Sequence, residues 1–369
     1  MKTLCIDLRM YDASGIGVYL RNIVQRLSAC GTFRIRGIVS PRSLQQILEL
    51  RSIEVVVSTA PIYSVREQID IPLKVGACDL FWTPHFNAPV VRIQAKKRVV
   101  TIHDVFHLAY GDALPWYKRI YAKQVICRAV HLADALITVS DFSKSEIQRY
   151  TGVHADKVHP ILNGVDTSFF QPGTARQYAG EGIGRHAIDR PFILFVGNLK
   201  QHKNLDGLLK AYKKWIGVHG TEYHLVLIGK TFENYSIIQA IQDDPIYQGQ
   251  VHVFSDVTDV ELCLFYGRAS VLVMPSFYEG FGFPPLEAMS CGCPTIVSKC
   301  TSLPEVCGDA AFYIDPYSIT SIYHGLCAVL HNPAMRDRMI DQGYAQVVKF
   351  SWQASSQKHL QLFERLLSV

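Results

Sequence analysis

The chain has 369 residues, a formal net charge of +5 and a hydrophobic fraction of 49%. This length exceeds one ordinary core and suits two domains, and the hydrophobic fraction excludes an intrinsically disordered chain. The modest positive charge favours anionic ligands or an anionic membrane face, and no apolar run is long enough to cross a bilayer.

The first half of the sequence alternates apolar strands with helical segments. A strand at residues 3–8 is followed by Gly15-Ile16-Gly17, where a helix begins. Five more strands are predicted, at residues 34–39, 52–59, 80–83, 98–102 and 135–139. Strands that alternate with helices predict a parallel sheet covered on both faces.

The second half restarts the same pattern with a strand at residues 192–196 and a helix at 205–216. Further strands are predicted at residues 225–228, 251–254, 270–274, 295–298 and 311–314. Between the halves, residues 166–190 are rich in glycine, glutamine and charged side chains and carry little periodicity, which predicts a linker. We therefore expect an α/β chain with two doubly wound, Rossmann-like domains, residues 1–165 and 191–349, facing each other across a cleft.

The most informative segment begins at Glu279 and ends at Glu287, and reads Glu-Gly-Phe-Gly-Phe-Pro-Pro-Leu-Glu. It directly follows a predicted strand, so that a strand, a glycine-rich loop and a helix start offer backbone N–H groups to a phosphate. The residues expected at that phosphate are Gly280, Phe281, Gly282 and Phe283. The two glutamates then need partners, for which the hydroxyl groups of a sugar and a ribose would serve. Alternatively, Glu287 caps or pairs within its own helix and Glu279 is a turn residue.

The run from Met274 to Val297 resembles the donor-site segment of the retaining family-four glycosyltransferases of GT-B fold. The resemblance implies that Glu279 lies by the donor sugar and that Glu287 binds the ribose of the nucleotide. In this family an Asn-Gly-Val-Asp sequence, here at 163–166, marks the crossing between the domains. An aromatic-Ser-Trp sequence precedes a helix that returns to the N-terminal domain, which assigns residues 350–369 to that domain.

Residues 196–205 look like the turn with which the family clamps the donor phosphates. Lys203 matches the family's lysine, whose positive charge suits a diphosphate leaving group. Many members hold an arginine just after the glycine of this turn, whereas this chain has Asn198. With one cation fewer, either His202 or the glycine-rich loop compensates, or catalysis is slower. The alternative for Lys203 is a solvated lysine at the start of a helix.

His103 directly follows a predicted strand, where an α/β protein aims a side chain into its cleft. The resemblance implies that it contacts the donor sugar, and His85 is a second candidate. Gly15 and Gly17 would let the backbone approach the donor phosphates or the acceptor, or they form a tight strand-to-helix connection. A dinucleotide fingerprint is incomplete because Leu20 takes the third glycine position, which argues against a nicotinamide-dependent oxidoreductase.

Neither a metal nor another cofactor is expected. The sequence has no Asp-x-Asp triplet, and a zinc site would have to join cysteines that a predicted strand separates. The cysteines concerned are Cys291, Cys293, Cys300 and Cys307. The resemblance implies retention of the sugar's anomeric configuration, with the leaving diphosphate helping to take the acceptor proton. Catalysis would then depend on Lys203 and on helix N-termini rather than on a dedicated base.

We expect an enzyme that moves a hexose from a nucleotide sugar to a growing, lipid-linked polysaccharide. The Gly-Ile-Gly-Val-Tyr and His-Asp-Val-Phe-His segments look like mannosyltransferases of bacterial surface-polysaccharide assembly, which favours mannose from GDP-mannose. Two alternatives stay open. One is a glucosyl- or N-acetylglucosaminyltransferase that uses a UDP-sugar, and the other is a nucleotide-sugar-binding subunit without turnover.

The expected location is the cytoplasm, because Asp7 comes too early for a signal peptide. Basic residues gather at Arg92, Lys96, Lys97 and Arg98, and again among aromatics at 116–123. A solvated helix face and peripheral attachment to anionic lipid at the inner face of the plasma membrane both fit these clusters. No nucleic-acid partner is expected, since the sequence shows no recognised reading module.

Overall fold

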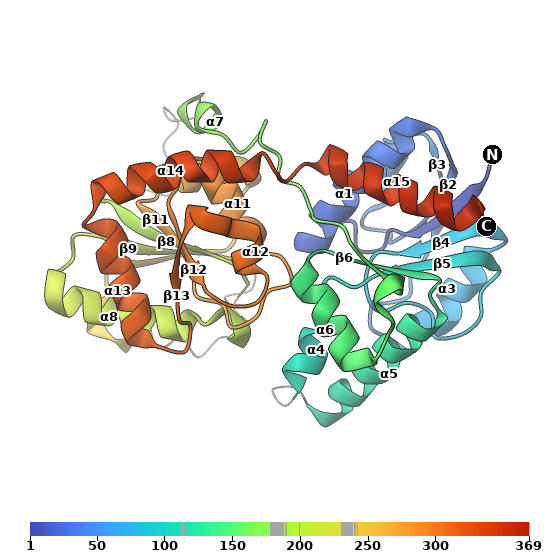
Figure 1. The fold of residues 1–369 in the computed structure, drawn as a ribbon, viewed down its shortest axis with the longest axis horizontal. Helices are drawn as coiled ribbons and strands as arrows, with labels where there is room; N and C mark the ends of the chain where they lie inside the picture. The colour runs from blue at the N-terminus through green and yellow to red at the C-terminus, as the bar shows by residue number, and fades with distance from the viewer. Residues whose placement is uncertain are drawn as a thin grey trace. The chain divides into compact units, whose positions relative to one another are not determined.

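The structure is a computed structural model that describes residues 1–111, 115–177, 188, 190–198, 200–229, 239, 241 and 243–368. The chain forms two compact units (Figure 1). Unit 1 holds Met1–Gly164 and Ser351–Val369, and unit 2 holds Val165–Phe350. The predicted linker begins with a short helix, α7 (Pro172–Gln177), whereas its residues 178–187 and 189 lie outside the described residues.

Unit 1 is built on a seven-stranded parallel sheet with the order β3-β2-β1-β4-β5-β6-β7. Its strands are β1 Thr3–Asp7, β2 Arg34–Val39, β3 Ile53–Val57, β4 Cys78–Thr83, β5 Ala95–Thr101, β6 Ala135–Thr138 and β7 Val158–Pro160. Its helices are α1 Gly15–Cys30, α2 Leu44–Leu48, α3 Glu67–Val75, α4 Phe106–Ala109, α5 Trp116–Leu132, α6 Asp141–Thr151, the 3-10 helix η2 Ala155–Lys157 and α15 Trp352–Ser368. The six predicted strands are confirmed. β7 escapes prediction because three residues that end in a proline carry no periodic signal.

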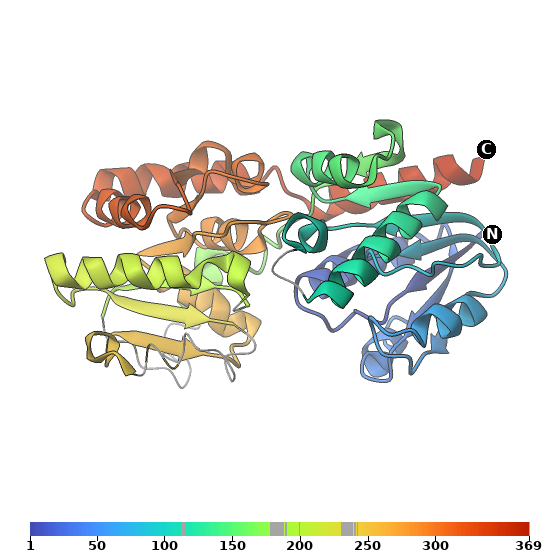
Figure 2. The ribbon, with the colours of Figure 1, turned by 90° about the horizontal axis from the view of Figure 1, so that it is seen from below.

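Helices cover both faces of this sheet. Phe81 of β4 packs into the cluster that includes α3, whereas the next residue, Trp82, packs against Phe363 of α15. Val100 of β5 lies on the Phe81 face, where it packs with residues of α5. Consequently α3 and α5 share one face, and Figure 2 shows α5 lying in front of the sheet when viewed from below.

Unit 2 is built on a six-stranded parallel sheet with the order β10-β9-β8-β11-β12-β13. Its strands are β8 Phe192–Val196, β9 His224–Ile228, β10 Val251–Phe254, β11 Val271–Met274, β12 Thr295–Ser298 and β13 Ala311–Ile314. Its other helices are α8 Leu205–His219, α10 Asp259–Arg268, α11 Phe283–Ser290, α12 Leu303–Cys307, α13 Ile319–Leu330, α14 Pro333–Val347 and the 3-10 helices η4 Gln201–Lys203, η5 Pro245–Tyr247 and η6 Gly308–Ala310. All six predicted strands are confirmed, four of them with the predicted bounds.

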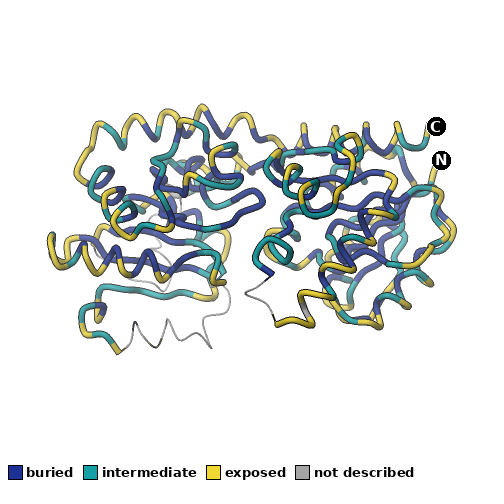
Figure 3. The backbone as a smooth tube through the Cα atoms, turned by 60° about the horizontal axis from the view of Figure 1, so that its bottom comes forward, coloured by how far each residue is buried: buried dark blue, intermediate teal, exposed yellow. Residues whose placement is uncertain are grey.

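The apolar runs of unit 2 are strands that are covered on both faces. Ile193 and Phe195 of β8 pack in a cluster with Trp215 of α8, whereas Leu194 packs on the opposite face with Ala288 of α11. The central strands β9, β8, β11 and β12 are accordingly buried along nearly all of their length, whereas the edge strands β10 and β13 are mostly half-buried (Figure 3). Each unit is therefore a doubly wound α/β sheet, as the sequence predicts.

No helix in the described part of the chain combines the length and the apolar character needed to cross a bilayer.

Candidate functional site

In unit 2 the order of the strands reverses between β8 and β11, which are neighbours in the sheet. Ligands of open α/β sheets bind at such a switch point, beyond the carboxyl ends of the strands. Lys203 in η4 follows β8, and Glu279 follows β11. The Lys203 Nζ lies 2.6 Å from Glu279 Oε1 and 2.8 Å from Oε2. With 17% and 9% of their side chains exposed, the pair is largely buried, which does not fit the alternative of a solvated lysine.

Asn204, the next residue after Lys203, ties three loops of this edge together. Its backbone is left-handed, with φ 55°, and its side-chain oxygen caps α8 by accepting from the Gly207 N–H at 3.2 Å. Its Nδ2 donates to the carbonyl oxygen of Pro275 at 3.0 Å, after β11, and to that of Pro316 at 2.7 Å, after β13. Asn204 therefore fixes the loop that carries Lys203 against the loop that carries Glu279.

Ser302, in the loop after β12, holds the other side of the Glu279 loop. Its hydroxyl donates to the carbonyl oxygens of Glu279 at 2.9 Å and Phe281 at 3.0 Å. The sequence analysis misses both anchors. An asparagine before a helical run is a cap signal that could have identified Asn204, whereas nothing in the sequence marks Ser302.

Glu287 lies on α11 and accepts a hydrogen bond of 2.9 Å from the hydroxyl of Tyr266 on α10. Burial raises the pKa of Glu287 to about 7, against the opposing effect of this hydrogen bond. The alternative that Glu287 pairs within its own helix is thus wrong, because its partner comes from a neighbouring helix. A carboxylate with so few neighbouring donors would be stabilised in its charged form by ligand hydroxyl groups.

The start of α11 offers fewer N–H donors than the sequence pattern suggests. A helix leaves four N–H groups unbonded at its start, but the second and third residues here, Pro284 and Pro285, have none. Gly282 precedes the helix with φ 97°, and a side chain there would clash with a leucine of α12. Gly280 and Phe281 are buried. Phosphate binding by residues 280–283 stays a prediction, and it depends more heavily on the charge of Lys203.

Asn198 is partly buried in the turn after β8, where its carbonyl oxygen accepts from the Lys200 N–H at 2.8 Å. Residue 199 lies outside the described residues. The side chain at this position is an uncharged amide, so the lysines described in this turn are Lys200 and Lys203.

His103 belongs to unit 1 and follows β5. Its Nε2–H donates to the carbonyl oxygen of Pro84 at 2.9 Å, and its ring stands edge-on to Tyr19. Burial lowers the pKa of His103 to about 4, against the opposing effect of the Pro84 carbonyl. The ring is therefore neutral at pH 7, with Nδ1 as a hydrogen-bond acceptor that suits a sugar hydroxyl.

Unit 1 has its own switch point, between β1 and β4, and a buried ionic cluster occupies it. Arg9 Nη2 lies 2.7 Å from Asp7 Oδ2 and 2.9 Å from Glu67 Oε2, and His85 Nε2 lies 3.7 Å from Asp7 Oδ2. Burial alone would raise the pKa of Asp7, but Arg9 and His85 hold it well below its usual range. The sequence analysis identifies His85 and misses its partners, which lie far apart along the chain.

Gly17 is buried inside the first turn of α1, and a Cβ there would lie 2.6 Å from the carbonyl oxygen of Tyr11. This contact supports the tight strand-to-helix connection as the reason for glycine at this position. Gly15, the first residue of α1, is exposed. A donor- or acceptor-binding role of either glycine stays a prediction.

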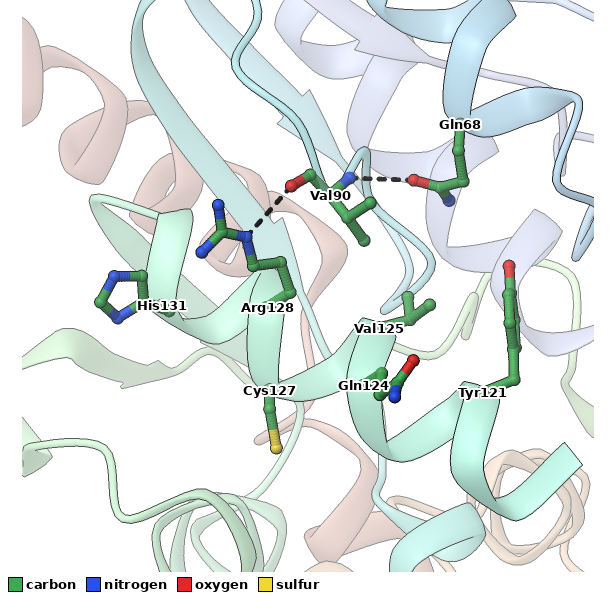
Figure 4. Close-up of a pocket in the computed structure, with 8 residues that line it drawn as sticks. All are labelled: Gln68, Val90, Tyr121, Gln124, Val125, Cys127, Arg128 and His131. Carbon is green, nitrogen blue, oxygen red and sulfur yellow. Dashed lines mark hydrogen bonds between the residues drawn. The ribbon is translucent and has the colours of Figure 1, made fainter. Parts of the chain in front are cut away.

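Among the described residues, no group of three or more His, Cys, Asp or Glu side chains is arranged to hold a metal ion. A cavity of about 580 Å³ lies in unit 1, on the face covered by α3 and α5 (Figure 4). Its lining residues are Gln68, Val90, Tyr121, Gln124, Val125, Cys127, Arg128 and His131. None of the predicted donor-site residues lines this cavity.

Two family models match the chain, one in each half. The model described as Glycosyltransferase Family 4 matches residues 13–169, which include His103. The model described as Glycosyl transferases group 1 matches residues 183–346, which include Lys203, Glu279 and Glu287.

Among characterised proteins, the chain is similar to O-antigen chain mannosyltransferase B of Escherichia coli. The two are 29% identical over 295 residues, which is 78% of this chain and 74% of that protein. The serotype-specific mannosyltransferase WbdA of Escherichia coli is 28% identical over 302 residues, and the chain spans about a third of its length, 36%.

Among solved structures, the fold is similar to that of sucrose-phosphate synthase from Thermosynechococcus elongatus, with a TM-score of 0.80 and 19% identity across the whole of both chains. It is also similar to Anabaena HepE in complex with UDP and glucose, with a TM-score of 0.77 and 16% identity across the whole of both chains. Together with the two family matches, these findings show a chain of GT-B fold in which a Glycosyltransferase Family 4 domain is followed by a Glycosyl transferases group 1 domain.

Proposed function

We propose that the protein is a retaining glycosyltransferase that transfers mannose from GDP-mannose to a growing, lipid-linked polysaccharide. The observation that carries the proposal is the contact between Lys203 and Glu279 at the switch point of unit 2, in which Glu279 precedes the first residue of α11, Phe283, by four positions. The mannosyltransferase activity named for the Escherichia coli relative supports mannose as the sugar. A lipid-linked acceptor and a nucleotide-sugar donor place the reaction at the cytoplasmic face of a membrane.

In this proposal Lys203 exchanges one of its two contacts with Glu279 for an oxygen of the donor diphosphate. Glu279 is then available to accept hydrogen bonds from the sugar, and Glu287 accepts them from the ribose hydroxyls. In unit 1, the neutral His103 offers Nδ1 to a sugar hydroxyl. Each contact orients the donor or stabilises charge that develops on the leaving group.

The transfer forms a bond between the acceptor oxygen and the anomeric carbon as the bond from that carbon to the diphosphate breaks. The acceptor hydroxyl passes its proton to an oxygen of the departing diphosphate on the same face of the sugar, so the anomeric configuration is retained. Lys203 supplies the positive charge that this step needs, and the proposed reaction requires neither a metal ion nor a dedicated base.

A UDP-sugar is the alternative donor, for a glucosyl- or N-acetylglucosaminyltransferase, and the similarity to a fold solved with UDP and glucose is the observation that favours it. A nucleotide-sugar-binding subunit without turnover is the other alternative, favoured by Asn198 in place of an arginine. Titration with GDP, UDP and ADP, followed by hydrolysis assays across a panel of nucleotide sugars, separates the three. We expect GDP to bind most tightly and GDP-mannose to be hydrolysed fastest. Binding of no nucleoside diphosphate would overturn the donor-site assignment, and tight binding without turnover would support the subunit.

A further inference from the structure

Two aromatic rings are stacked at the carboxyl edge of the unit 2 sheet. Phe277 follows β11 and Tyr317 follows β13, and the centroids of their rings lie 4.8 Å apart at an interplanar angle of 26°. Phe277 is partly buried, whereas 71% of the surface of Tyr317 is exposed. A single exposed tyrosine is ordinary on a protein surface, but this one is held in place by a second ring. We call the pair the 277–317 platform.

Asn204 fixes the two loops that carry the platform. Its Nδ2 donates to the carbonyl oxygen of Pro275 at 3.0 Å and to that of Pro316 at 2.7 Å. Pro275 stands two residues before Phe277, and Pro316 directly precedes Tyr317. The two rings are therefore held together before any ligand binds, so that a ligand loses little affinity to the ordering of these loops.

The platform lies next to the residues predicted to hold the donor sugar and its phosphates. The Phe277 N–H donates at 2.7 Å to the carbonyl oxygen of His202, which directly precedes the predicted phosphate-binding lysine. Glu279 follows Phe277 by two residues, and the Cys300 Sγ donates to the Phe277 carbonyl oxygen at 3.8 Å. Burial raises the pKa of the Cys300 thiol, and the carboxylates of Asp315 and Glu279 raise it further, because both lie near it.

Asp315 adds a hydrogen-bond acceptor beside the platform. Its Oδ1 accepts from the Tyr317 N–H at 3.0 Å. The residue is partly exposed, and within the described residues its Oδ2 has no hydrogen-bond partner. An aromatic ring and a carboxylate together suit a sugar, because the C–H groups on one face of a sugar ring pack on the aromatic ring while hydroxyl groups at its edge donate to the carboxylate.

The nucleoside of the donor is predicted to bind on the other side of the switch point. Its expected ribose contact, Glu287, is bonded to Tyr266 of α10, the helix that follows the edge strand β10. Tyr317 follows β13, the strand at the opposite edge of the sheet. The platform is therefore poorly placed to stack on the base, and the ring that remains to be bound at this edge is a sugar.

We propose that the 277–317 platform binds a sugar ring of the acceptor glycan, which stacks on Tyr317 and donates hydrogen bonds from its hydroxyl groups to Asp315. The inference rests on the proposed function, because that function supplies the glycan. It adds to unit 2 a glycan subsite made of residues outside the predicted donor site. Such a subsite holds the growing chain while a hydroxyl group of that chain reacts with the donor sugar.

Titration with free saccharides, followed by saturation-transfer NMR, tests the platform without turnover. The probes are α-linked mannotriose, maltotriose and mannitol, which has the hydroxyl groups of a sugar but no ring. We expect a trisaccharide to bind the wild-type protein and mannitol not to bind. Tyr317→Ala should weaken trisaccharide binding about tenfold and Asp315→Asn severalfold, whereas Tyr317→Phe keeps the ring and should restore binding.

The matched control is Tyr344→Ala, which truncates an exposed tyrosine of α14 near Gly292, beyond the C-terminal end of α11, and should leave trisaccharide binding unchanged. Circular dichroism checks the folding of each variant. Binding of neither trisaccharide, equal binding by Tyr317→Ala and the wild-type protein, or elution as a dimer that Tyr317→Ala dissociates overturns the proposal. GDP titration of the same samples reports on the proposed function separately. A protein that binds GDP but no trisaccharide keeps the donor site without the platform, and one that binds a trisaccharide but no GDP keeps the platform without the donor site.

Discussion

The ammonium group of Lys203 has two short contacts with Glu279, and a diphosphate would compete for the same charge. Replacing Lys203 by alanine should lower kcat by about 10²-fold or more, because the charge that develops on the leaving group loses its cation. Steady-state kinetics with the donor that is turned over fastest measures this effect. The variant also leaves the buried Glu279 without its partner, which should cost about 1–3 kcal/mol of stability.

The control for this variant is Lys210→Ala on α8, which removes an exposed pair with Asp206 at spacing i, i+4. Surface pairs of this kind contribute little to stability and should contribute nothing to turnover. If folded Lys203→Ala keeps wild-type kcat, Lys203 does not act on the leaving group.

The raised pKa of Glu287 makes nucleotide binding depend on pH. Ribose hydroxyls donate hydrogen bonds to the ionised carboxylate, so binding should release the proton that Glu287 holds below its pKa of about 7. Affinity for GDP should therefore fall, by up to about tenfold per pH unit, as the pH is lowered below that value. Isothermal titration between about pH 5.5 and pH 8 measures the dependence.

Two variants separate Glu287 from the titration of the nucleotide itself. Glu287→Gln should keep only the dependence that comes from the diphosphate, while Tyr266→Phe removes a donor to the carboxylate and should move the wild-type midpoint to higher pH. The same slope in Glu287→Gln and in the wild-type protein would remove Glu287 from the ribose site.

At the scale of single residues, the sequence indicates the chemistry of the site and leaves out its supports. Glu279, Lys203 and Glu287 stand in local patterns that can be recognised within ten residues. Tyr266 and Ser302 act through contacts that span 21 to 23 positions of the sequence, and one sequence contains no signal for such pairs. The sequence shows the two prolines of α11, but which free N–H groups they remove from the start of the helix depends on where the helix begins.

At the scale of elements, apolar runs predict the central strands of each sheet because these strands are buried on both faces. β12 is a continuous run of buried residues and β8 is buried in all but its last residue, and both have the predicted bounds. β7 is the exception, since its pairing with β6 rather than its composition makes it a strand. Pairing of that kind depends on the rest of the sheet, which a short segment does not encode.

Asn204 shows how one cap can join several elements, and its replacement tests the junction. Asn204→Ala should lower the free energy of unfolding by about 2–4 kcal/mol, because it removes a helix cap, two buried hydrogen bonds and a residue type that tolerates left-handed φ. GDP affinity should fall as well, since the Lys203 loop loses its tie to the loops after β11 and β13.

The matched control is Asn332→Ala, which removes the cap of α14 but no tie between loops. Asn332 Oδ1 accepts from the Met335 N–H at 3.0 Å, and its loss should cost about 1 kcal/mol and leave GDP affinity unchanged. Urea unfolding and GDP titration of both variants decide the matter. Equal losses of stability, with equal GDP affinities, would show that Asn204 serves only as a cap.

At the scale of the whole molecule, buried titratable groups give the two units opposite responses to acid. In unit 1, burial lowers the pKa of His359 to about 4. Its Nδ1–H donates to the carbonyl oxygen of Ser355 and its Nε2 accepts from the hydroxyl of Tyr19, so a second proton, on Nε2, breaks this network. The unfolded chain binds more protons than folded unit 1 between about pH 6.5 and pH 4, so unit 1 loses stability as the pH falls through that window. Glu287 in unit 2 has the opposite sign. Its folded pKa of about 7 exceeds the usual 4.5, so the contribution of Glu287 to the stability of unit 2 is complete below pH 4.5 and is lost as the pH rises through 7.

Scanning calorimetry of the full-length protein should therefore resolve two transitions that separate when the pH is lowered from about 7 to about 5. His359 alone should cost unit 1 about 2 kcal/mol over this step, while protonation of Glu287 should favour unit 2 by a similar amount. GDP identifies the unit 2 transition, because a ligand that binds only the folded unit raises its midpoint with concentration. Glu287→Gln should remove the gain in stability that the unit 2 transition shows at lower pH. It should leave unchanged the loss of stability that the unit 1 transition shows. Two transitions that move in parallel with pH would contradict the assignment of these pKa shifts to separate units.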